Sequence, residues 1–422
     1  MNFGNRSALA RRDPSPRATI LWRAPLKIAC IGTRGLPSSY SGLERACEGL
    51  YSALAERGHA ITVYCRSESA AHASESYRGI QLRSAPAIQS KQLETLTHAA
   101  SSLIHALRRQ RYDLIHLHAL APGIFSRLCR ASGIPTVSTV QGLDWQRAKW
   151  KGLGAKVLEF AEVSMVRNVD QILVVSRDLQ QYYADRYGRE TTYIPNGVEP
   201  VNAKEYEGST VLQEFGLKSR GYVLYLGRLV PEKRVEDVIA GYRGVRSDYK
   251  LVIAGEGCAE ADLRRLAAED KRVVFVGHQK KPAVHQLLHH AAVFASASAL
   301  EGLPMSLLEC MLHGTPAVVS DIAPHRELLG EVDGYDLFFP PGHVELLRTK
   351  LEAALVRQGE YRRVAELGQR FASERHSWPE IAERTETVYY DALYQPAGHA
   401  RLGLHRKQFP TAKEIGGRTQ AT

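Results

Sequence analysis

Two glutamates and a proline form the segment of this sequence that is best suited to chemistry. Glu301 and Glu309 are eight positions apart, and Pro304 stands between them where a helix would begin. Glu301 would then lie in a loop and Glu309 one to two turns into the helix, so both carboxylates can face one cleft. Carboxylates bind the hydroxyl groups of a ribose or a hexose, and the free N–H groups of a helix start bind phosphate. The alternative is that both glutamates are ordinary surface residues.

Two basic side chains supply the complementary charge. Arg228 and Lys233 follow an apolar run at 222–226, and ligands bind at the carboxyl ends of strands in open α/β sheets. An arginine fork and a lysine point charge can together neutralise a diphosphate without a metal ion. The sequence has no Asp-x-Asp, the carboxylate pair that most often holds a metal-bound nucleotide diphosphate. This absence favours metal-independent phosphate binding over the alternative of a solvated basic loop.

The elements that must position these residues alternate between short apolar runs and helical patterns. The run 26–31 is nearly continuous and stops at Gly32, which is typical of a parallel strand buried on both faces. A loop rich in glycine and serine follows, and apolar residues then recur at helical spacing over 43–54. Further strands are predicted at 60–64, 113–117, 136–140 and 171–175. This alternation predicts a doubly wound α/β fold with a parallel sheet.

The same order of elements starts again after residue 220. Strands are predicted at 222–226, 250–254, 273–276, 293–296 and 317–320. Two Rossmann-like halves of this kind form one cleft between them. We therefore expect a disordered basic tail at 1–25, an N-terminal domain at 26–200, a linker at 201–220, a C-terminal domain at 221–377, a helix at 378–394 that crosses back to the N-terminal domain, and a disordered tail at 395–422.

The length and composition suit a two-domain globular protein. The chain has 422 residues, 44% hydrophobic and 24% charged, which excludes a fibrous or wholly disordered chain. Its apolar runs are far shorter than the roughly 20 residues of a bilayer span. The arginine-rich start lacks the apolar stretch of a secretory signal, so we expect a cytoplasmic protein, with an organelle transit peptide as the alternative. The six cysteines are widely spaced and are expected to be buried, reduced thiols.

The net charge of +10 is unevenly distributed. Residues 1–150 carry 20 Lys and Arg against 9 Asp and Glu, whereas the rest of the chain is nearly neutral. A basic half is typical of a protein that contacts nucleic acid, an anionic membrane or an acidic substrate, and a solvated surface without a partner is the alternative. No zinc-finger spacing or RNA-binding motif accompanies the charge, so no nucleic-acid partner is expected.

Together these segments resemble the retaining glycosyltransferases of family 4, the glycosyl transferases group 1, over residues 26–394. That family has the GT-B architecture, in which two Rossmann-like domains face each other across a cleft. The resemblance rests on the spacing of Glu301 and Glu309, on Gly227-Arg228-Leu229 with Glu232-Lys233, and on Ile194-Pro195-Asn196-Gly197-Val198. A bacterial subgroup that builds surface polysaccharides is similar in two further segments, 32–42 and 142–150.

The resemblance implies a role for each matching position. Arg228 and Lys233 would bind the donor phosphates, Glu309 the ribose hydroxyls and Glu301 the transferred sugar. His118, after the predicted strand 113–117, would face the donor sugar and complete a catalytic set of Glu301, Arg228, Lys233 and His118. The donor site is expected to comprise Gly227, Arg228, Lys233, Gly277, His278, Glu301, Gly302, Leu303, Pro304, Met305, Ser306 and Glu309. The side of the acceptor or the donor sugar is expected to comprise Gly35, Tyr40, Ser41, Gly42, His118, Gln141 and Asn196.

The activity that the resemblance implies is transfer of a hexosyl residue, with retention, from a UDP- or GDP-sugar to a glycan or lipid-linked sugar acceptor in surface polysaccharide biosynthesis. The leaving diphosphate can itself take the acceptor proton, so no side-chain base, cofactor or metal ion is expected. The alternatives are a nucleotide-sugar 2-epimerase of the same fold and a catalytically silent nucleotide-sugar-binding subunit. An NAD-dependent oxidoreductase is disfavoured because Gly32-Thr33-Arg34-Gly35 lacks the G-x-G-x-x-G pattern.

Four further expectations follow from the resemblance. His116 would point into the fold, in contrast to His118. Gln141 stands where many members have histidine, which would alter the acceptor site. Ala297-Ser298 stands where Pro-Ser is usual, which would adjust only the backbone. The linker near Gly197 and the helix from Trp378 would act as hinges for domain closure. Acceptors in the family are often lipid-linked, so contact with an anionic inner-membrane surface is expected through Arg34, Arg45, Arg108, Arg109 and Arg111.

Overall fold

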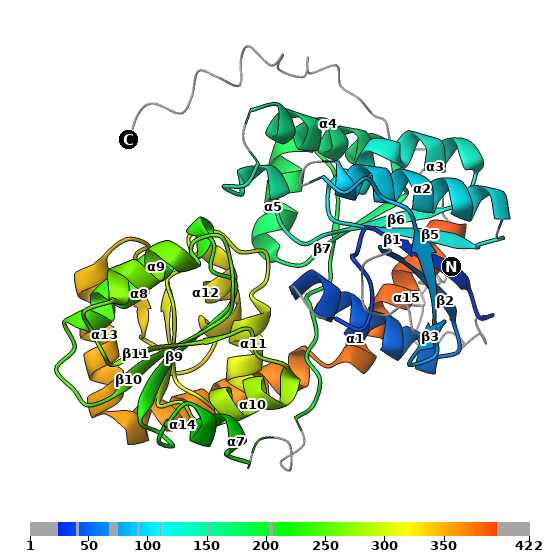
Figure 1. The fold of residues 1–422 in the computed structure, drawn as a ribbon. Helices are drawn as coiled ribbons and strands as arrows, with labels where there is room; N and C mark the ends of the chain where they lie inside the picture. The colour runs from blue at the N-terminus through cyan, green and yellow to red at the C-terminus, as the bar shows by residue number, and fades with distance from the viewer. Residues whose placement is uncertain are drawn as a thin grey trace, which may run out of the picture.

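Two lobes, each built on one parallel sheet with helices on both faces, make up the computed structural model (Figure 1). The predicted doubly wound α/β class is therefore confirmed. The structure describes residues 24–38, 42–66, 75–90, 93–109, 111–150, 152–201, 206 and 208–394.

The N-terminal sheet has eight strands in the order β3-β4-β2-β1-β5-β6-β7-β8, all parallel except for the hairpin of β3 with β4. The five strands predicted in this half are present, with ends that differ by at most two residues. Strands β3, β4 and β8 were not predicted, because the edge strands β3 and β8 have only two residues each, and β4, which lies next to β3, is partly exposed and lacks a continuous apolar run. The strands are β1 (Lys27–Ile31), β2 (Ala60–Arg66), β3 (Ser76–Tyr77), β4 (Ile80–Ala85), β5 (Leu114–His118), β6 (Thr136–Val140), β7 (Gln171–Val174) and β8 (Thr192–Tyr193).

The helices of this lobe follow the strands in alternation, as right-handed crossovers between parallel strands require. One of them, α5, shows why such a helix begins and ends where it does. The Ser176 side chain accepts a hydrogen bond from the N–H of Leu179 at its start, and Gly188 adopts the left-handed conformation at its end. The helices are α1 (Gly42–Glu56), α2 (Glu94–Arg109), η2 (Ala121–Phe125), α3 (Ser126–Ser132), η3 (Asp144–Gln146), α4 (Leu153–Asn168) and α5 (Arg177–Tyr187).

The C-terminal sheet has six strands, all parallel, in the order β11-β10-β9-β12-β13-β14. All five strands predicted in this half are present, and four of them have the predicted bounds. The strands are β9 (Tyr222–Leu226), β10 (Lys250–Ala254), β11 (Val273–Gly277), β12 (Val293–Ser296), β13 (Ala317–Ser320) and β14 (Phe338–Phe339). The helices are α7 (Thr210–Glu214), η4 (Pro231–Lys233), α8 (Val235–Arg243), α9 (Glu260–Ala267), α10 (Lys281–His290), α11 (Met305–Leu312), α12 (Ala323–Leu329), α13 (Val344–Val356) and α14 (Gln358–Arg375).

The chain passes between the lobes twice, and the two passages lie side by side. The N–H of Val198 donates to the carbonyl oxygen of His376 over 2.7 Å, and Gly197 packs directly on the indole of Trp378. The last helix, α15 (Trp378–Tyr394), then packs against α1 of the N-terminal lobe. Within the stretch 201–220, expected as a linker, α7 packs against α10 of the C-terminal lobe.

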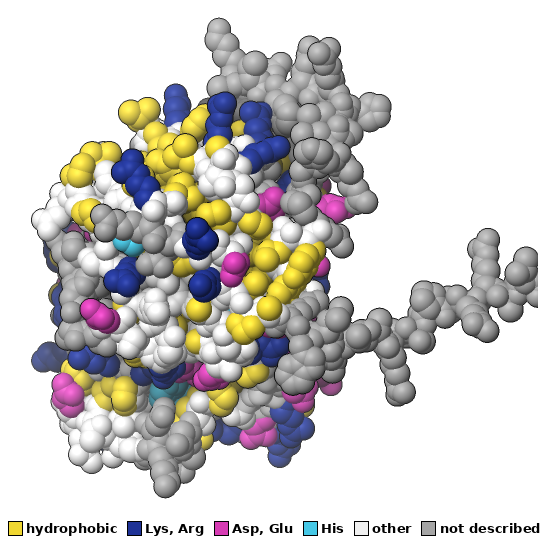
Figure 2. Space-filling model, turned by 90° about the vertical axis from the view of Figure 1, so that its right-hand side faces the viewer, with side chains coloured by type: hydrophobic (Ala, Val, Ile, Leu, Met, Phe, Trp, Pro, Cys, Tyr) yellow, Lys and Arg dark blue, Asp and Glu magenta, His cyan; other side chains and the backbone are white. Residues whose placement is uncertain are grey.

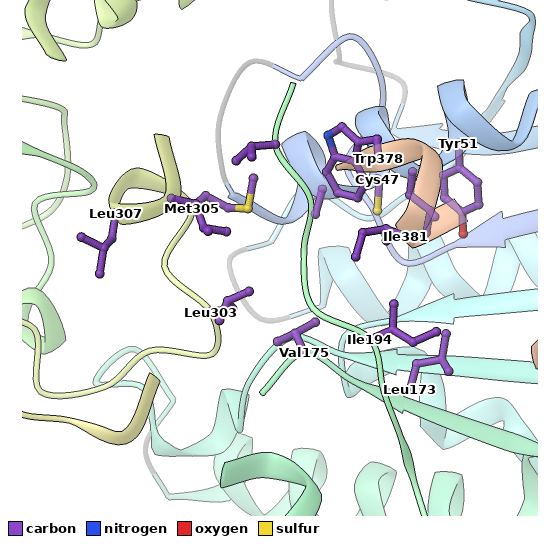
Figure 3. Close-up of a cluster of buried hydrophobic side chains, with 14 of the residues drawn as sticks. Cys47, Tyr51, Leu173, Val175, Ile194, Leu303, Met305, Leu307, Trp378 and Ile381 are labelled. Atoms are coloured by element: carbon purple, nitrogen blue, oxygen red, sulfur yellow. The ribbon is translucent and has the colours of Figure 1, made fainter. Parts of the chain in front are cut away.

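The two lobes share a hydrophobic cluster at their interface (Figure 3). Leu303 and Met305, at the start of α11, extend from the C-terminal lobe towards Val175, Ile194 and the start of α15. Close packing of this kind fixes the helix start of one lobe against the strand ends of the other. The cluster therefore places the segment 301–309, which carries Glu301 and Glu309, at the interface of the two lobes.

Candidate active site

The first predicted glutamate is joined to the predicted lysine. Lys233 ends η4, which follows β9, and Glu301 lies in the loop after β12, the neighbouring strand of the sheet. The N–H of Ala299 donates to the carbonyl oxygen of Glu232 over 2.9 Å and ties the two loops together. The ammonium of Lys233 then forms an ion pair with Oε1 of Glu301. The structure thus brings together two predicted residues that are far apart in the sequence.

The surroundings of Glu301 keep its carboxyl ionised. Burial alone would raise the pKa of Glu301, but the Lys233 charge, together with His325 and Ser298, holds it below the usual value. His325 is itself fully buried, and burial lowers its pKa, so Lys233 is the cation that balances the carboxylate near neutral pH. The Glu301 carboxylate can bind a sugar hydroxyl, and the Lys233 ammonium beside it can bind a phosphate.

A stack of glycines positions the loop that carries Arg228. A Cβ on Gly255 would overlap the carbonyl oxygen of Gly227, and a Cβ on Gly257 would overlap that of Leu229. The N–H of Gly255 also donates to the carbonyl oxygen of Gly277 over 2.8 Å. Sequence reasoning missed Gly255 and Gly257, although two glycines directly after a predicted strand are the signal that would have found them.

The start of α11 faces the N-terminal lobe at close range. Pro304 precedes the helix in an extended conformation, so the first N–H groups of α11 have no partner within the helix. A Cβ on Gly302 would overlap the carbonyl oxygen of Gln141. The side-chain amides of Gln141 and Asn196 form two reciprocal hydrogen bonds of 3.0 Å behind this contact. Gln141, which departs from the family pattern, therefore lies at the interface of the two lobes.

The second predicted glutamate pairs with an arginine of the opposite lobe. Nη1 of Arg45, on α1, lies 2.5 Å from Oε1 and 2.7 Å from Oε2 of Glu309, in the second turn of α11. The two helices also meet at their starts, where Gly42 lies against the Met305 side chain. Arg45 was expected at a membrane surface, and this expectation is wrong because its guanidinium pairs with Glu309 at the interface of the two lobes.

His118 belongs to β5 rather than to the loop after it, and the expected contrast with His116 is wrong. Residues two apart in a strand share a face, and both rings are buried and contact one hydroxyl. Tyr51 Oη lies 2.6 Å from Nε2 of His118 and 2.8 Å from Nδ1 of His116. Nδ1 of His118 has no hydrogen-bond partner among the described residues. Pairing of His118 with Thr139 of β6 explains why the strand continues this far.

A buried group of thiols surrounds His118. The potential ligand atoms of Cys30, Cys47 and His118 lie within 4.8 Å of one another, which the wide sequence spacing did not predict. Burial raises the pKa of the Cys30 thiol, but hydrogen bonds and the neighbouring His118 lower it to about 5. Cys258, by contrast, is exposed, so the expectation that all six cysteines are buried is wrong at that position. Cys258 lies on a loop after β10, where no core surrounds it.

The other predicted residues differ in backbone conformation and in burial. Gly35 adopts a positive φ of 144° in the loop after β1, and Gly277 one of 67° at the end of β11. His278 is exposed, and Ser306 is half-buried in the first turn of α11. Tyr40 and Ser41 lie outside the described residues. Arg108, within α2, and Arg111, beyond its end, are both exposed. Arg34 is half-buried, and the side chain of Arg109 is not described.

Two family models match the chain in succession. The model described as Glycosyltransferase Family 4 matches residues 40–201, and the model described as Glycosyl transferases group 1 matches residues 212–371. An uncharacterized glycosyltransferase of Methanocaldococcus jannaschii is 24% identical over 87% of this chain and 99% of its own length. The UDP-Gal:alpha-D-GlcNAc-diphosphoundecaprenol alpha-1,3-galactosyltransferase of Escherichia coli is 27% identical over 56% of this chain and 64% of its own length.

Solved structures of the same architecture match nearly the whole described fold. The sucrose-phosphate synthase of Thermosynechococcus elongatus superimposes with a TM-score of 0.74 at 20% identity, covering 87% of this chain and 98% of that one. HepE of Anabaena, solved with UDP and glucose, superimposes with a TM-score of 0.72 at 18% identity, covering 87% of this chain and 100% of that one.

Among the described residues, no helix combines the length and the hydropathy that crossing a membrane requires.

Proposed function

The chain belongs to the family 4 glycosyltransferases, with their group 1 domain in its second half, and from this premise we propose that it transfers a hexosyl residue from a UDP- or GDP-sugar to a glycan or lipid-linked sugar, with retention. The ion pair of Lys233 with Glu301 beside the start of α11 is the observation that carries the proposal. It joins a phosphate-binding cation, a hydroxyl-binding carboxylate and free helix N–H groups at the interface of two lobes.

In the proposed reaction, the bond between the anomeric carbon and the donor diphosphate breaks, and its electron pair goes to the diphosphate oxygen. The acceptor hydroxyl forms the new bond on the same face of the sugar, and its proton passes to that leaving oxygen. Arg228, Lys233 and the N–H groups at the start of α11 stabilise the developing negative charge. The transfer therefore needs no side-chain base and no metal ion.

Two further residues would bind the donor from either side. Glu309 would accept hydrogen bonds from the ribose hydroxyls, since its carboxylate lies one helix turn beyond the phosphate-binding N–H groups. The resemblance also assigns His118 to the transferred sugar; its ring is buried in β5, and its Nδ1 lacks a partner among the described residues. Glu309 lies on a helix that packing holds rigid, which favours precise positioning.

The substrate classes are proposed by analogy with similar proteins. HepE was solved with UDP and glucose, and the similar galactosyltransferase of Escherichia coli is named for a UDP-sugar donor and a lipid-diphosphate acceptor. The chemistry of the site supports the same donor class, because cations and carboxylates at one interface suit a charged, hydroxyl-rich donor. A nucleotide-sugar 2-epimerase would need a further acid and base at the sugar, and an inactive binding subunit would bind the donor without consuming it.

We place the enzyme at the cytoplasmic face of an anionic membrane, through a basic-apolar face formed by α2, α3 and α4. Leu153 and Phe160, both on α4, are 78% and 62% exposed, and the acidic residues of α4 are half-buried or buried. Basic and hydrophobic side chains lie side by side on the upper part of Figure 2, which views the molecule from the side of α2 and α3. The exposed members of this face are Ile104, Arg108, Arg127, Leu128, Arg130, Leu153, Lys156, Phe160 and Arg167.

Vesicle flotation tests this membrane contact. Wild-type protein should float with vesicles that contain anionic lipid and remain behind with neutral ones, because basic side chains near the surface add to apolar insertion. The double variant Leu153→Ser, Phe160→Ser should lose most of this binding. Val356→Ser, which removes an 84% exposed side chain from the other lobe, is the matched control. Equal flotation of all three proteins would rule out the proposed face.

Calorimetric binding of UDP, GDP and ADP, with and without magnesium, tests the proposed function. Wild-type protein should bind one of the uridine or guanosine diphosphates without metal, and Arg228→Ala and Lys233→Ala should each weaken this binding at least about tenfold. Incubation with the matching sugar nucleotides should then release the diphosphate only when an acceptor or water takes the sugar. Conversion of the donor sugar to its 2-epimer, or binding without any turnover, would support one of the two alternatives instead.

A further inference from the structure

Two thiols and an imidazole lie close together inside the N-terminal lobe. The atoms that Cys30, Cys47 and His118 could offer to a metal ion, two sulfurs and one ring nitrogen, lie within 4.8 Å of one another. Cys30 and Cys47 are 0% exposed, and His118 is 1% exposed. This is the one group of three potential metal ligands of this kind in the part of the chain that the structure describes. Neither cysteine takes part in the proposed transfer.

The sheet and the first helix bring these three residues together. Cys30 of β1 pairs in parallel register with His116 of β5, and His118 lies two residues further along that strand. Paired residues of neighbouring strands share a face of the sheet, as do residues two apart in one strand, so Cys30 and His118 point to the same side. Helix α1 covers that side, because Tyr51, one turn after Cys47 on this helix (Figure 3), contacts both histidine rings through its hydroxyl. Each potential ligand therefore comes from a different element.

The other buried cysteines have ordinary surroundings. Cys65 and Cys310 donate from sulfur to backbone carbonyl oxygens over 3.6 and 3.3 Å. Cys129 belongs to a separate apolar cluster with Leu117, on the opposite face of the same sheet. Buried thiols of this kind act as small apolar side chains. Two thiols beside an imidazole differ from them, because thiolate sulfur and imidazole nitrogen are the ligands that Zn²⁺ takes in proteins.

His118 already has one contact that a metal-binding histidine requires. Its Nε2 lies 2.6 Å from the hydroxyl oxygen of Tyr51, whereas its buried Nδ1 has no hydrogen-bond partner among the described residues. A histidine that binds a metal ion through one ring nitrogen almost always has an oxygen partner at the other, which fixes the orientation of the ring. His118 therefore has an oriented ring and an unused nitrogen.

We propose that Cys30, Cys47 and His118 bind one Zn²⁺ ion, which fixes α1 to β1 and β5. Both thiols lose their protons to solvent on binding, and the two thiolates balance the two charges of the ion. A Cu⁺ ion in the same place would leave one net negative charge, and an unbalanced charge inside a protein is costly. Zinc takes a fourth ligand beside three protein ligands, and a water molecule or hydroxyl oxygen would fill that position. The site goes beyond the proposed transfer, which uses no metal ion, and gives His118 a structural role in place of the sugar contact that the resemblance assigns to it.

The zinc content of the purified chain tests this proposal. The protein, without an affinity tag, is produced in zinc-supplemented medium, purified with a phosphine reductant and dialysed against a weak chelator before elemental analysis. Wild-type protein should retain about one zinc ion per chain, and Cys30→Ser and Cys47→Ser should each lose most of it. Cys129→Ser, which removes a buried thiol from the opposite face of the same sheet, is the matched control and should retain zinc as the wild type does.

Exchange of the zinc for Co²⁺ identifies the ligands and needs no variant. Tetrahedral cobalt bound by thiolates absorbs in the visible range and, through charge transfer from sulfur to the metal, in the near ultraviolet. Wild-type protein and Cys129→Ser should show both absorptions. Removal of the ion with a strong chelator should also lower the melting temperature of these two proteins, because the ion binds only the folded chain.

Wild-type protein without zinc, or with zinc that Cys30→Ser and Cys47→Ser retain, overturns the proposal. A cobalt spectrum without charge transfer from sulfur also overturns it, because the ion then lies on histidines such as His285 and His313, whose ring nitrogens are 3.0 Å apart in the other lobe. A disulfide between Cys30 and Cys47 in protein prepared without reductant, with no zinc in the reduced protein, would identify a redox-active pair instead. If circular dichroism shows that the serine variants do not fold, the cobalt spectrum of the wild type decides.

Discussion

At the scale of single residues, three glycines near the site are important because they have no Cβ. Gly302 permits the carbonyl of Gln141 to approach its Cα, and Gly255 and Gly257 do the same for the loop that carries Arg228. A side chain at any of these positions would collide with backbone, which cannot rotate away as a side-chain end can. The reactive groups therefore depend on neighbours that have no chemistry of their own.

Replacement of Gly302 by alanine should separate the lobes at the site. The added Cβ would overlap the carbonyl oxygen of Gln141, so the loop that carries Glu301 must shift. A displacement of about 1 Å in a site of this kind can lower kcat/KM about 100-fold. Donor turnover and small-angle scattering would measure the loss and the opening of the cleft.

Gly359→Ala is the matched control, because nothing lies within 4 Å of a Cβ at that helical position. It should retain activity and gain up to about 1 kcal/mol of stability from the higher helix propensity of alanine. Wild-type turnover by Gly302→Ala would show that the contact with Gln141 is not needed for transfer.

At the scale of elements, two helices meet end to end across the cleft. α1 contributes Arg45 and α11 contributes Glu309, and the side chains are 28% and 13% exposed. Arg45 contacts both carboxylate oxygens of Glu309, the same two atoms that a pair of ribose hydroxyls would use. The ion pair therefore competes with the proposed ribose contact for these oxygens, and we expect donor binding to displace Arg45.

Removal of the arginine should consequently strengthen nucleotide binding. A partly exposed ion pair is worth about 1 kcal/mol or less, so Arg45→Ala should lower the Kd for the nucleoside diphosphate by up to about fivefold. Calorimetry on the purified variant measures this change. Arg57→Ala, which breaks an ion pair with Glu386 inside the N-terminal lobe, should leave the Kd unchanged. A weaker affinity in Arg45→Ala would show instead that Arg45 holds Glu309 in position for the ribose.

At the scale of the whole molecule, buried histidines make stability depend on pH. Burial lowers the pKa of His98 to about 4 and that of His313 to about 3, compared with 6.5 for an unperturbed histidine. At a pH between the folded and the unfolded pKa of such a histidine, the unfolded chain binds more protons than the folded one. Each of these histidines therefore costs stability as the pH falls below its unfolded pKa, until the folded pKa is reached.

Urea unfolding at pH 7, 6 and 5 should show a progressive loss of stability. Each such histidine contributes a slope of about 1.4 kcal/mol per pH unit over its window. His98→Gln, which cannot be protonated, should reduce the slope by about that amount, whereas replacement of the exposed His278 should not change it. A slope that is the same in His98→Gln and in the wild type would contradict this assignment.

The sequence alone determined the α/β class and most of the strands. Strands such as β9 and β10 are buried on both faces, so each is a continuous apolar run that ends at a glycine. The meeting of Lys233 and Glu301 followed as well, because the carboxyl ends of neighbouring parallel strands lie at one edge of a sheet. Strand β4 was missed because it is partly exposed and lacks this pattern.

Contacts between the lobes were decided only by the tertiary structure. Arg45 and Glu309 are 264 positions apart, and no local pattern marks either as the partner of the other. The same holds for Gly302 against Gln141. Hydrophobic periodicity reports which face of an element is buried within its own lobe. The placement of one lobe on the other depends instead on the shape and charge of surfaces that form only after each lobe has folded.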